Sequence, residues 1–152
     1  MQKLILRSFL FMILLAFASR VHAQTVGADD LIGTWLTASG KAKVQIYKEN
    51  GHYNGKIVWL KNPTYEDGKP KVDKHNPVEA NRSKPLMGLN MLKNFVFDED
   101  QWNDGTIYDP ENGKLYSCKI QIRDGNKLDV RGYIGISLIG RTETWFKVQD
   151  IK

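Results

Sequence analysis

Cysteine and histidine are scarce in this chain of 152 residues, which has one cysteine and three histidines. One thiol cannot form an internal disulfide, so stability must come from a packed core. In the segment LYSCKIQI, Cys118 alternates in step with Tyr116, Ile120 and Ile122, the pattern of one buried strand face. We therefore interpret Cys118 as a small core residue and not as a reactive thiol.

Metal-binding and catalytic motifs are also missing. His52 and His75 lie in predicted turns or loops, without a His-x-x-x-His pair, a paired-cysteine site or a Gly-rich phosphate loop. The acidic run at Asp98–Asp100 lacks the spacing of a Ca²⁺ loop, and no serine lies in a nucleophile elbow. We expect no metal, no cofactor and no catalytic residue, and hence a protein that is not an enzyme.

Long apolar runs are limited to the N-terminal region. The run at 9–18 has about 10 apolar residues, far short of the roughly 20 that a membrane-spanning helix needs. Two basic residues precede it, and a Val-x-Ala pattern ending at Ala23 follows it, as in a signal peptide cleaved at that point. We predict that residues 1–23 are removed from an exported protein, periplasmic or secreted. The mature part is predicted to be one domain at 24–152 without a membrane span.

The excess of positive charge is small in the predicted mature chain. The whole sequence carries +5, but Lys3, Arg7 and Arg20 leave with the signal peptide, which lowers the charge to about +2. The remaining lysines and acidic residues are interspersed, without the basic stripe and stacking aromatics of nucleic-acid-binding proteins. We expect no nucleic-acid partner, and the sequence does not indicate an oligomeric state.

Short strand patterns recur along the mature chain, at 31–37, 43–48, 52–60, 95–97, 105–109, 114–122, 127–135 and 141–148. The sequences PENG and RDGN separate the last strands, and their glycines supply the positive φ that tight turns demand. Consecutive strands joined by such turns run antiparallel.

Residues 61–94 have a different composition, since they hold four of the five prolines. Proline removes hydrogen-bond donors from a strand, so this segment is not expected to be a central strand. Its end, PLMGLNMLKNF, has enough apolar residues to dock a short helical turn. We expect a partly ordered lid or plug that covers one end of the fold.

These patterns predict an all-β protein, an antiparallel up-and-down β-barrel of about eight strands with a long central loop. The alternative is a two-sheet sandwich. We favour the barrel because closure removes exposed sheet edges, and because apolar residues at both chain ends favour pairing of the first and last strands.

Two short motifs resemble the terminal strands of lipocalin-like (calycin-like) barrels: GTW at 33–35 and GRTETW at 140–145. The resemblance implies that Trp35 closes the barrel floor and that Arg141 packs across its ring. Such a contact of a cation with an indole face contributes about 0.5–2 kcal/mol.

A longer resemblance covers most of the mature chain. The segments DKHNPVEANRSKPLMGL, WNDGTIYDPENGKLYSCKIQI and KLDVRGYIGISLIGRTETW are similar to the exported bacterial family of domain of unknown function 2147 (DUF2147). This resemblance implies a small exported protein of lipocalin-like architecture. It implies no activity, so it transfers no catalytic residue.

An eight-stranded barrel is either filled by side chains or able to hold one small ligand. The leading hypothesis is a non-enzymatic barrel that binds a small, partly apolar or anionic molecule. Tyr116 is expected to face inward, and Arg131 to supply a buried positive charge. The candidate ligand-binding residues are Trp35, Tyr116, Arg131, Tyr133, Arg141 and Trp145. The competing interpretation is that the aromatic residues only fill the core.

Two other functions stay open. One is an interaction module with a solid barrel, which docks a partner protein through the basic loop or the segment GISLIG at 135–140. The other is an enzyme at the barrel mouth, which requires His75, Asp73 and Arg82 to converge in a concave site.

Overall fold

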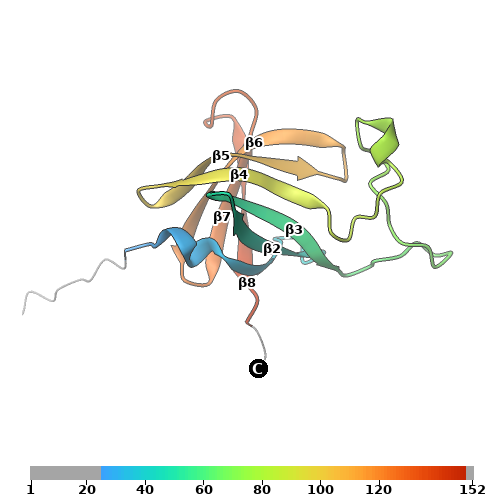
Figure 1. The fold of residues 1–152 in the computed structure, drawn as a ribbon, viewed down its shortest axis with the longest axis horizontal. Helices are drawn as coiled ribbons and strands as arrows, with labels where there is room; N and C mark the ends of the chain where they lie inside the picture. The colour runs from blue at the N-terminus through green and yellow to red at the C-terminus, as the bar shows by residue number, and fades with distance from the viewer. Residues whose placement is uncertain (1–24, 150–152) are drawn as a thin grey trace, which may run out of the picture.

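Each strand pairs antiparallel with its neighbours in the sequence, and the last strand pairs with the first, so the sheet is a closed barrel (Figure 1). The computed structural model describes residues 25–149, and the predicted signal peptide lies outside them. The strands are β1 (Gly33–Leu36), β2 (Ala42–Glu49), β3 (His52–Leu60), β4 (Asn90–Asp98), β5 (Gln101–Asp109), β6 (Lys114–Asp124), β7 (Lys127–Tyr133) and β8 (Gly140–Lys147). The predicted eight-stranded up-and-down barrel is therefore confirmed.

The closing seam between β1 and β8 is short. Trp35 pairs with Lys147 and Leu36 pairs with Phe146, and the Val148 amide donates to the Thr34 carbonyl at 2.8 Å. This pairing confirms that the two ends of the barrel sequence lie side by side.

The turn between β2 and β3 shows how the sequence directs a hairpin. Asn50 and Gly51 both have positive φ, at 50° and 81°. A two-residue turn of this kind matches the right-handed twist of the flanking strands and favours Asn-Gly. The turn therefore sets the register between β2 and β3.

One end of the barrel, called the floor here, is closed by a 3-10 helix, η2 (Ala28–Leu31). The Trp35 indole Nε1 donates to the Leu31 carbonyl at 2.9 Å, and the Trp102 Nε1 donates to the Ala28 carbonyl at 3.1 Å. Above the helix, alternate residues of each strand point inward and fill the barrel, among them Trp35, Val44, Ile46, Tyr53, Leu92, Phe95, Trp102, Cys118, Ile120, Leu128, Val130 and Trp145. Cys118 is fully buried, as predicted.

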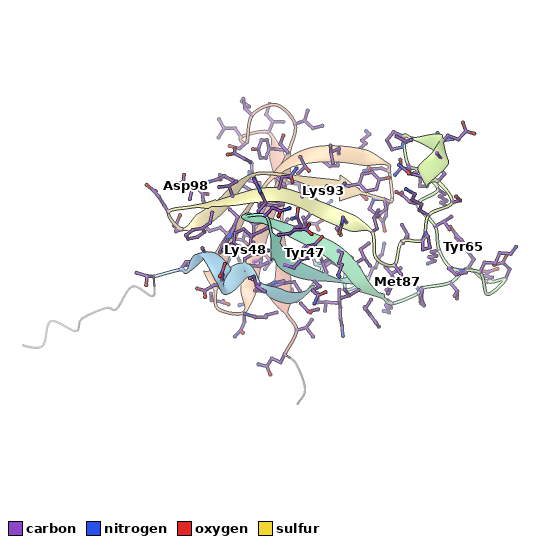
Figure 2. All side chains as sticks on the ribbon, viewed as in Figure 1. Tyr47, Lys48, Tyr65, Met87, Lys93 and Asp98 are labelled. Atoms are coloured by element: carbon purple, nitrogen blue, oxygen red, sulfur yellow. The ribbon has the colours of Figure 1, made fainter. Side chains whose placement is uncertain are left out.

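The opposite end, called the mouth here, carries the long connection between β3 and β4. It spans 61–89, and we call it the excursion. Its one regular element is a 3-10 turn, η3 (Glu79–Asn81). The excursion extends beyond the ends of β3 and β4, and Figure 2 shows Tyr65 well away from the strands. No helix forms within 85–95. The Leu89 amide donates to the Leu86 carbonyl at 3.1 Å and closes a single turn, and Asn90 begins β4.

No helix in the described part of the chain is both long enough and apolar enough to cross a membrane.

Candidate functional site

The inward-facing residues of the barrel become more exposed to solvent from the floor to the mouth. On β6, Cys118 and Ile120 are at most 1% exposed, whereas Tyr116, the next inward residue toward the mouth, is half-buried. On β8, Trp145 is buried, while the Glu143 and Arg141 side chains are 40% and 85% exposed. The inward face is thus buried toward the floor and exposed to solvent toward the mouth.

Five residues on β5 to β8 line this mouth region, and we call them the mouth cluster: Ile107, Tyr116, Gly132, Arg141 and Glu143. Register brings them together, since Ile107 pairs with Tyr116 and Gly132 pairs with Arg141. Glu143 lies opposite the buried Val130 and therefore shares its inward face.

Gly132 contributes no side chain at the centre of the mouth cluster. A Cβ atom added there would lie 3.5 Å from Ile107 Cγ2 and 3.7 Å from Tyr116 Cβ, both ordinary contacts. The Asn112 side-chain amide donates to the Tyr116 hydroxyl at 3.2 Å. The space beside Gly132 is therefore bordered by one apolar and one aromatic side chain, with the tyrosine hydroxyl held by Asn112.

Arg141 lies in the mouth cluster, not on Trp35. Its Nη2 is 3.2 Å from Glu143 Oε1. The cation over the Trp35 ring is Lys147, with its Nζ 5.3 Å from the ring centroid. The role implied for Arg141 is wrong because the strand register places Lys147, and not Arg141, directly opposite Trp35.

Trp145 carries an unpaired donor inside the barrel. Its Nε1 is buried and has no hydrogen-bond partner, the one such side-chain atom in the described part of the chain. Trp145 follows Glu143 on the same inward face of β8, so it lies between the floor and the mouth cluster. Trp35 differs, because its Nε1 is bonded to Leu31 and its ring belongs to the floor.

Arg131 and Tyr133 point out of the barrel. Leu128 and Val130 are buried on β7, so the alternate residues Arg131 and Tyr133 occupy the outer face. The Arg131 guanidinium donates to Thr142 Oγ1 at 2.9 Å on the outer face of β8. The prediction that Arg131 supplies a buried charge inside the barrel is therefore wrong.

The excursion is anchored on the outer wall by a buried carboxylate. Asp73 is 1% exposed, and it accepts a hydrogen bond from the Tyr108 hydroxyl at 2.7 Å and from the Asn76 amide at 2.6 Å. Burial, together with the bond to Asp73, raises the pKa of Tyr108 to about 12. One carboxylate oxygen of Asp73 therefore attaches the excursion to β5, and the other accepts a hydrogen bond from within the excursion.

This arrangement does not form the catalytic site that the enzyme hypothesis requires. Arg82 Nε donates to the Asn76 carbonyl at 2.9 Å, while His75 is exposed. Asp73 is already bonded to Tyr108 and Asn76, so His75, Asp73 and Arg82 do not converge in a concave site. Within residues 25–149, no cluster of three metal-ligating side chains occurs.

A broad hollow lies on the excursion itself, outside the barrel, with a volume of about 820 Å³. It is lined by Lys61, Asn62, Pro63, Thr64, Tyr65, Glu66, Asp67 and Lys71. These residues come from one continuous piece of surface loop, so the hollow is unrelated to the barrel interior.

Comparison with known families identifies the chain's family. Residues 33–147 match the family model described as "Uncharacterized protein conserved in bacteria (DUF2147)". The chain belongs to this family. The match runs from the first residue of β1 to the last residue of β8, so the family model corresponds to the complete barrel. No curated protein matches the chain.

A solved structure confirms the architecture of this DUF2147 barrel. The chain is similar to HP1028 from Helicobacter pylori, which is described as belonging to the lipocalin family. The TM-score is 0.69 at 22% sequence identity, and the similarity covers 83% of this chain and 86% of HP1028. At this identity the comparison shows a shared lipocalin-like fold.

Sequence reasoning missed Ile107, Gly132 and Glu143 as parts of the site. Their grouping depends on register between strands, which a single sequence does not specify. The outward direction of Arg131 could, however, have been predicted from the sequence. The alternation of Leu128 and Val130 in KLDVRGY already assigns Arg131 to the outer face.

Proposed function

We propose that this protein binds a small, partly apolar molecule with an acidic or other hydrogen-bond-accepting group, held within the mouth half of the barrel. The observation that carries the proposal is the unpaired Nε1–H of Trp145 below the mouth cluster. Leaving a buried donor without a partner costs about 1–3 kcal/mol, and native proteins seldom do so. An acceptor on a bound molecule would remove this cost.

The mouth cluster provides the other contacts that such a molecule needs. Ile107 and the ring of Tyr116 border the space beside Gly132, and Arg141 offers a cation with an 85% exposed side chain. A few polar groups in a mainly apolar setting are typical of small-molecule sites. A molecule with an aliphatic or aromatic body and a carboxylate fits this set.

The proposal can be tested by filling the space with a side chain. We expect Gly132→Leu to abolish binding by occupying the space beside Gly132, where an added Cβ makes ordinary contacts with Ile107 and Tyr116. Circular dichroism and the melting temperature without ligand check that the variant folds. Thermal shift with a panel of fatty acids and aromatic acids measures this. A ligand at 100 times its Kd adds about 2.7 kcal/mol of stability to the wild type and nothing to the variant.

The matched control is Gly125→Ala at the floor end, where an added Cβ meets nothing within 4 Å. It should retain the full thermal shift. The proposal is wrong if no acid in the panel stabilises the wild type, or if Gly132→Leu responds as strongly as the wild type does.

A further inference from the structure

The loop between β7 and β8 exposes an unusual amount of apolar surface. Residues 134–139, called the aliphatic loop here, lie at the mouth end of the barrel. Ile134, Ile136, Leu138 and Ile139 are 67%, 60%, 85% and 70% exposed. The loop extends beyond the strands at the top of Figure 1. Four large aliphatic side chains on one short loop form a cluster, unlike the single exposed apolar residues that are common on protein surfaces.

Three backbone carbonyls of the aliphatic loop have hydrogen-bond partners within the protein. Arg131 donates through Nε to the Ser137 carbonyl at 2.8 Å and through Nη2 to the Leu138 carbonyl at 3.3 Å. The Ile139 amide donates to the Ile136 carbonyl at 3.1 Å. In water these carbonyls would find solvent partners without help. Internal partners matter most where water is excluded, because an unpaired backbone group in hydrocarbon costs several kcal/mol.

The side chains of the aliphatic loop suit lipid better than a protein partner. Protein-binding hot spots are enriched in Trp, Tyr and Arg, whereas leucine is under-represented among them. Ile and Leu side chains transfer favourably into a bilayer. The aromatic residue next to the loop, Tyr133, is of the type enriched at the membrane–water interface.

The charges next to the aliphatic loop are mainly positive. Arg141 lies two residues after the loop, has an 85% exposed side chain and is ion-paired with Glu143 at 3.2 Å. Lys119 lies opposite Arg131 on the neighbouring strand β6. Basic residues beside an apolar surface favour anionic lipid headgroups, each contributing about 1 kcal/mol near the membrane surface.

We propose that the aliphatic loop inserts into the headgroup region of an anionic lipid bilayer and holds the barrel mouth against it. Arg131 is a positioning residue that pairs the loop carbonyls, while the four aliphatic side chains enter the lipid and Arg141 contacts the headgroups. This proposal does not depend on the ligand proposed above. The exposed 135–140 segment is the surface suggested by the interaction-module hypothesis, with lipid in place of a partner protein.

The test is co-sedimentation of residues 24–152 with vesicles of equimolar phosphatidylglycerol and phosphatidylcholine. Residues 1–23 are omitted because their apolar run would itself bind lipid, while the eight strands and the family match lie within residues 33–147. We expect Ile136→Ser/Leu138→Ser to weaken binding by at least about tenfold, because burial of each CH₂ contributes about 0.8 kcal/mol. Arg141→Gln should weaken it about fivefold on anionic vesicles only.

Val78→Ser is the matched control, since Val78 is 56% exposed but lies on the excursion. It should bind vesicles as the wild type does. Leu138→Trp supplies an independent readout, because brominated lipids should quench its fluorescence. Equal binding by the wild type and the double serine variant, or no binding to vesicles at all, would overturn the proposal. Capture of a protein by the loop without lipid would overturn it in favour of a protein partner. Because acid binding is measured without lipid, either proposal can fail alone.

Discussion

At the scale of single residues, the core depends on close contact between an aromatic ring and the backbone. A Cβ added at Gly105 would collide with the Phe95 ring, whose side chain is 1% exposed. Gly105 follows Asp104, which has a φ of 58° and lies at a register irregularity in β5. The missing side chain at 105 thus leaves room for a large ring on the neighbouring strand. A dense core tolerates little added volume at such a position.

Gly105→Ala is therefore expected to lower the free energy of unfolding by about 1–3 kcal/mol, because Phe95 must leave its position. Urea denaturation at constant pH measures the change. Gly125→Ala adds the same methyl group where nothing lies within 4 Å, so its effect should stay within about 0.5 kcal/mol. Equal effects of the two substitutions would contradict the contact between Phe95 and Gly105.

At the scale of elements, the excursion is a folded attachment and not a free loop. Its bridge between Val72 and Pro85 draws its two arms together, and the Asp73 carboxylate bonds to Tyr108 on β5. Without the Tyr108 hydroxyl, one oxygen of this buried carboxylate would lose its hydrogen-bond donor, which is costly in a low-dielectric environment. Replacing Tyr108 by phenylalanine therefore removes this link between the excursion and β5 and keeps the aromatic ring in place.

We expect Tyr108→Phe to destabilise the protein by about 1–3 kcal/mol and to speed proteolysis within 61–89. The sign of the pH effect follows from the raised pKa of Tyr108, about 12 against an ordinary value of 10.0. The stabilisation is complete below pH 10 and is lost as the pH rises toward 12. Chemical denaturation at several pH values should show the wild type approaching the variant over this range.

Tyr47→Phe is the control, since the Tyr47 hydroxyl bonds to Asn90 at 3.2 Å in an exposed position. Its effect on stability should be small. If both variants show the same proteolysis pattern, the bond between Tyr108 and Asp73 does not hold the excursion.

One element differs from its prediction, the helical turn within 85–95, and the backbone of β4 gives the reason. Leu92 and Phe95 are both buried on β4, three positions apart, because Asn94 takes a left-handed conformation with a φ of 63°. An irregularity of this kind breaks the alternation of a strand and imitates the spacing of a helix. The apolar residues of PLMGLNMLKNF therefore predicted a helical turn, whereas from Asn90 on the segment belongs to β4.

At the scale of the whole molecule, the barrel has one weak seam. The β1–β8 pairing joins two residue pairs, whereas β5 and β6 are joined by seven. Fewer ladder contacts mean that less free energy opposes local opening. The closure that removes sheet edges is thus held by the shortest pairing, with the Lys147 ammonium over the Trp35 ring as support.

Hydrogen exchange should show that the amides of β1 are less protected than those of β5 and β6. Amides of β1 are expected to exchange before those of β5 and β6, because opening the seam releases β1 from one neighbour without unfolding the rest. Exchange followed by mass spectrometry, with peptides covering 33–36 and 101–124, measures the order. Uniform exchange across the barrel would show instead that it opens only as a whole.

The sequence alone determined the number of strands, their antiparallel order, the closure of the barrel and the buried position of Cys118. The strands, their order and the position of Cys118 follow from local alternation and turn residues, which can be read within a few positions. Closure was favoured because it removes exposed sheet edges and because both chain ends carry apolar residues. Trp35 was also placed correctly at the floor, on a motif next to the first strand.

Only the tertiary structure decided which residues meet at the mouth and which cation lies on Trp35. Ile107, Gly132 and Glu143 come together through register across three strand pairs, and Lys147 replaces Arg141 for the same reason. A shift of one residue in a strand reverses every side chain on it. The balance of long-range packing sets that register, so local sequence determines the walls of this barrel and the assembled barrel determines its site.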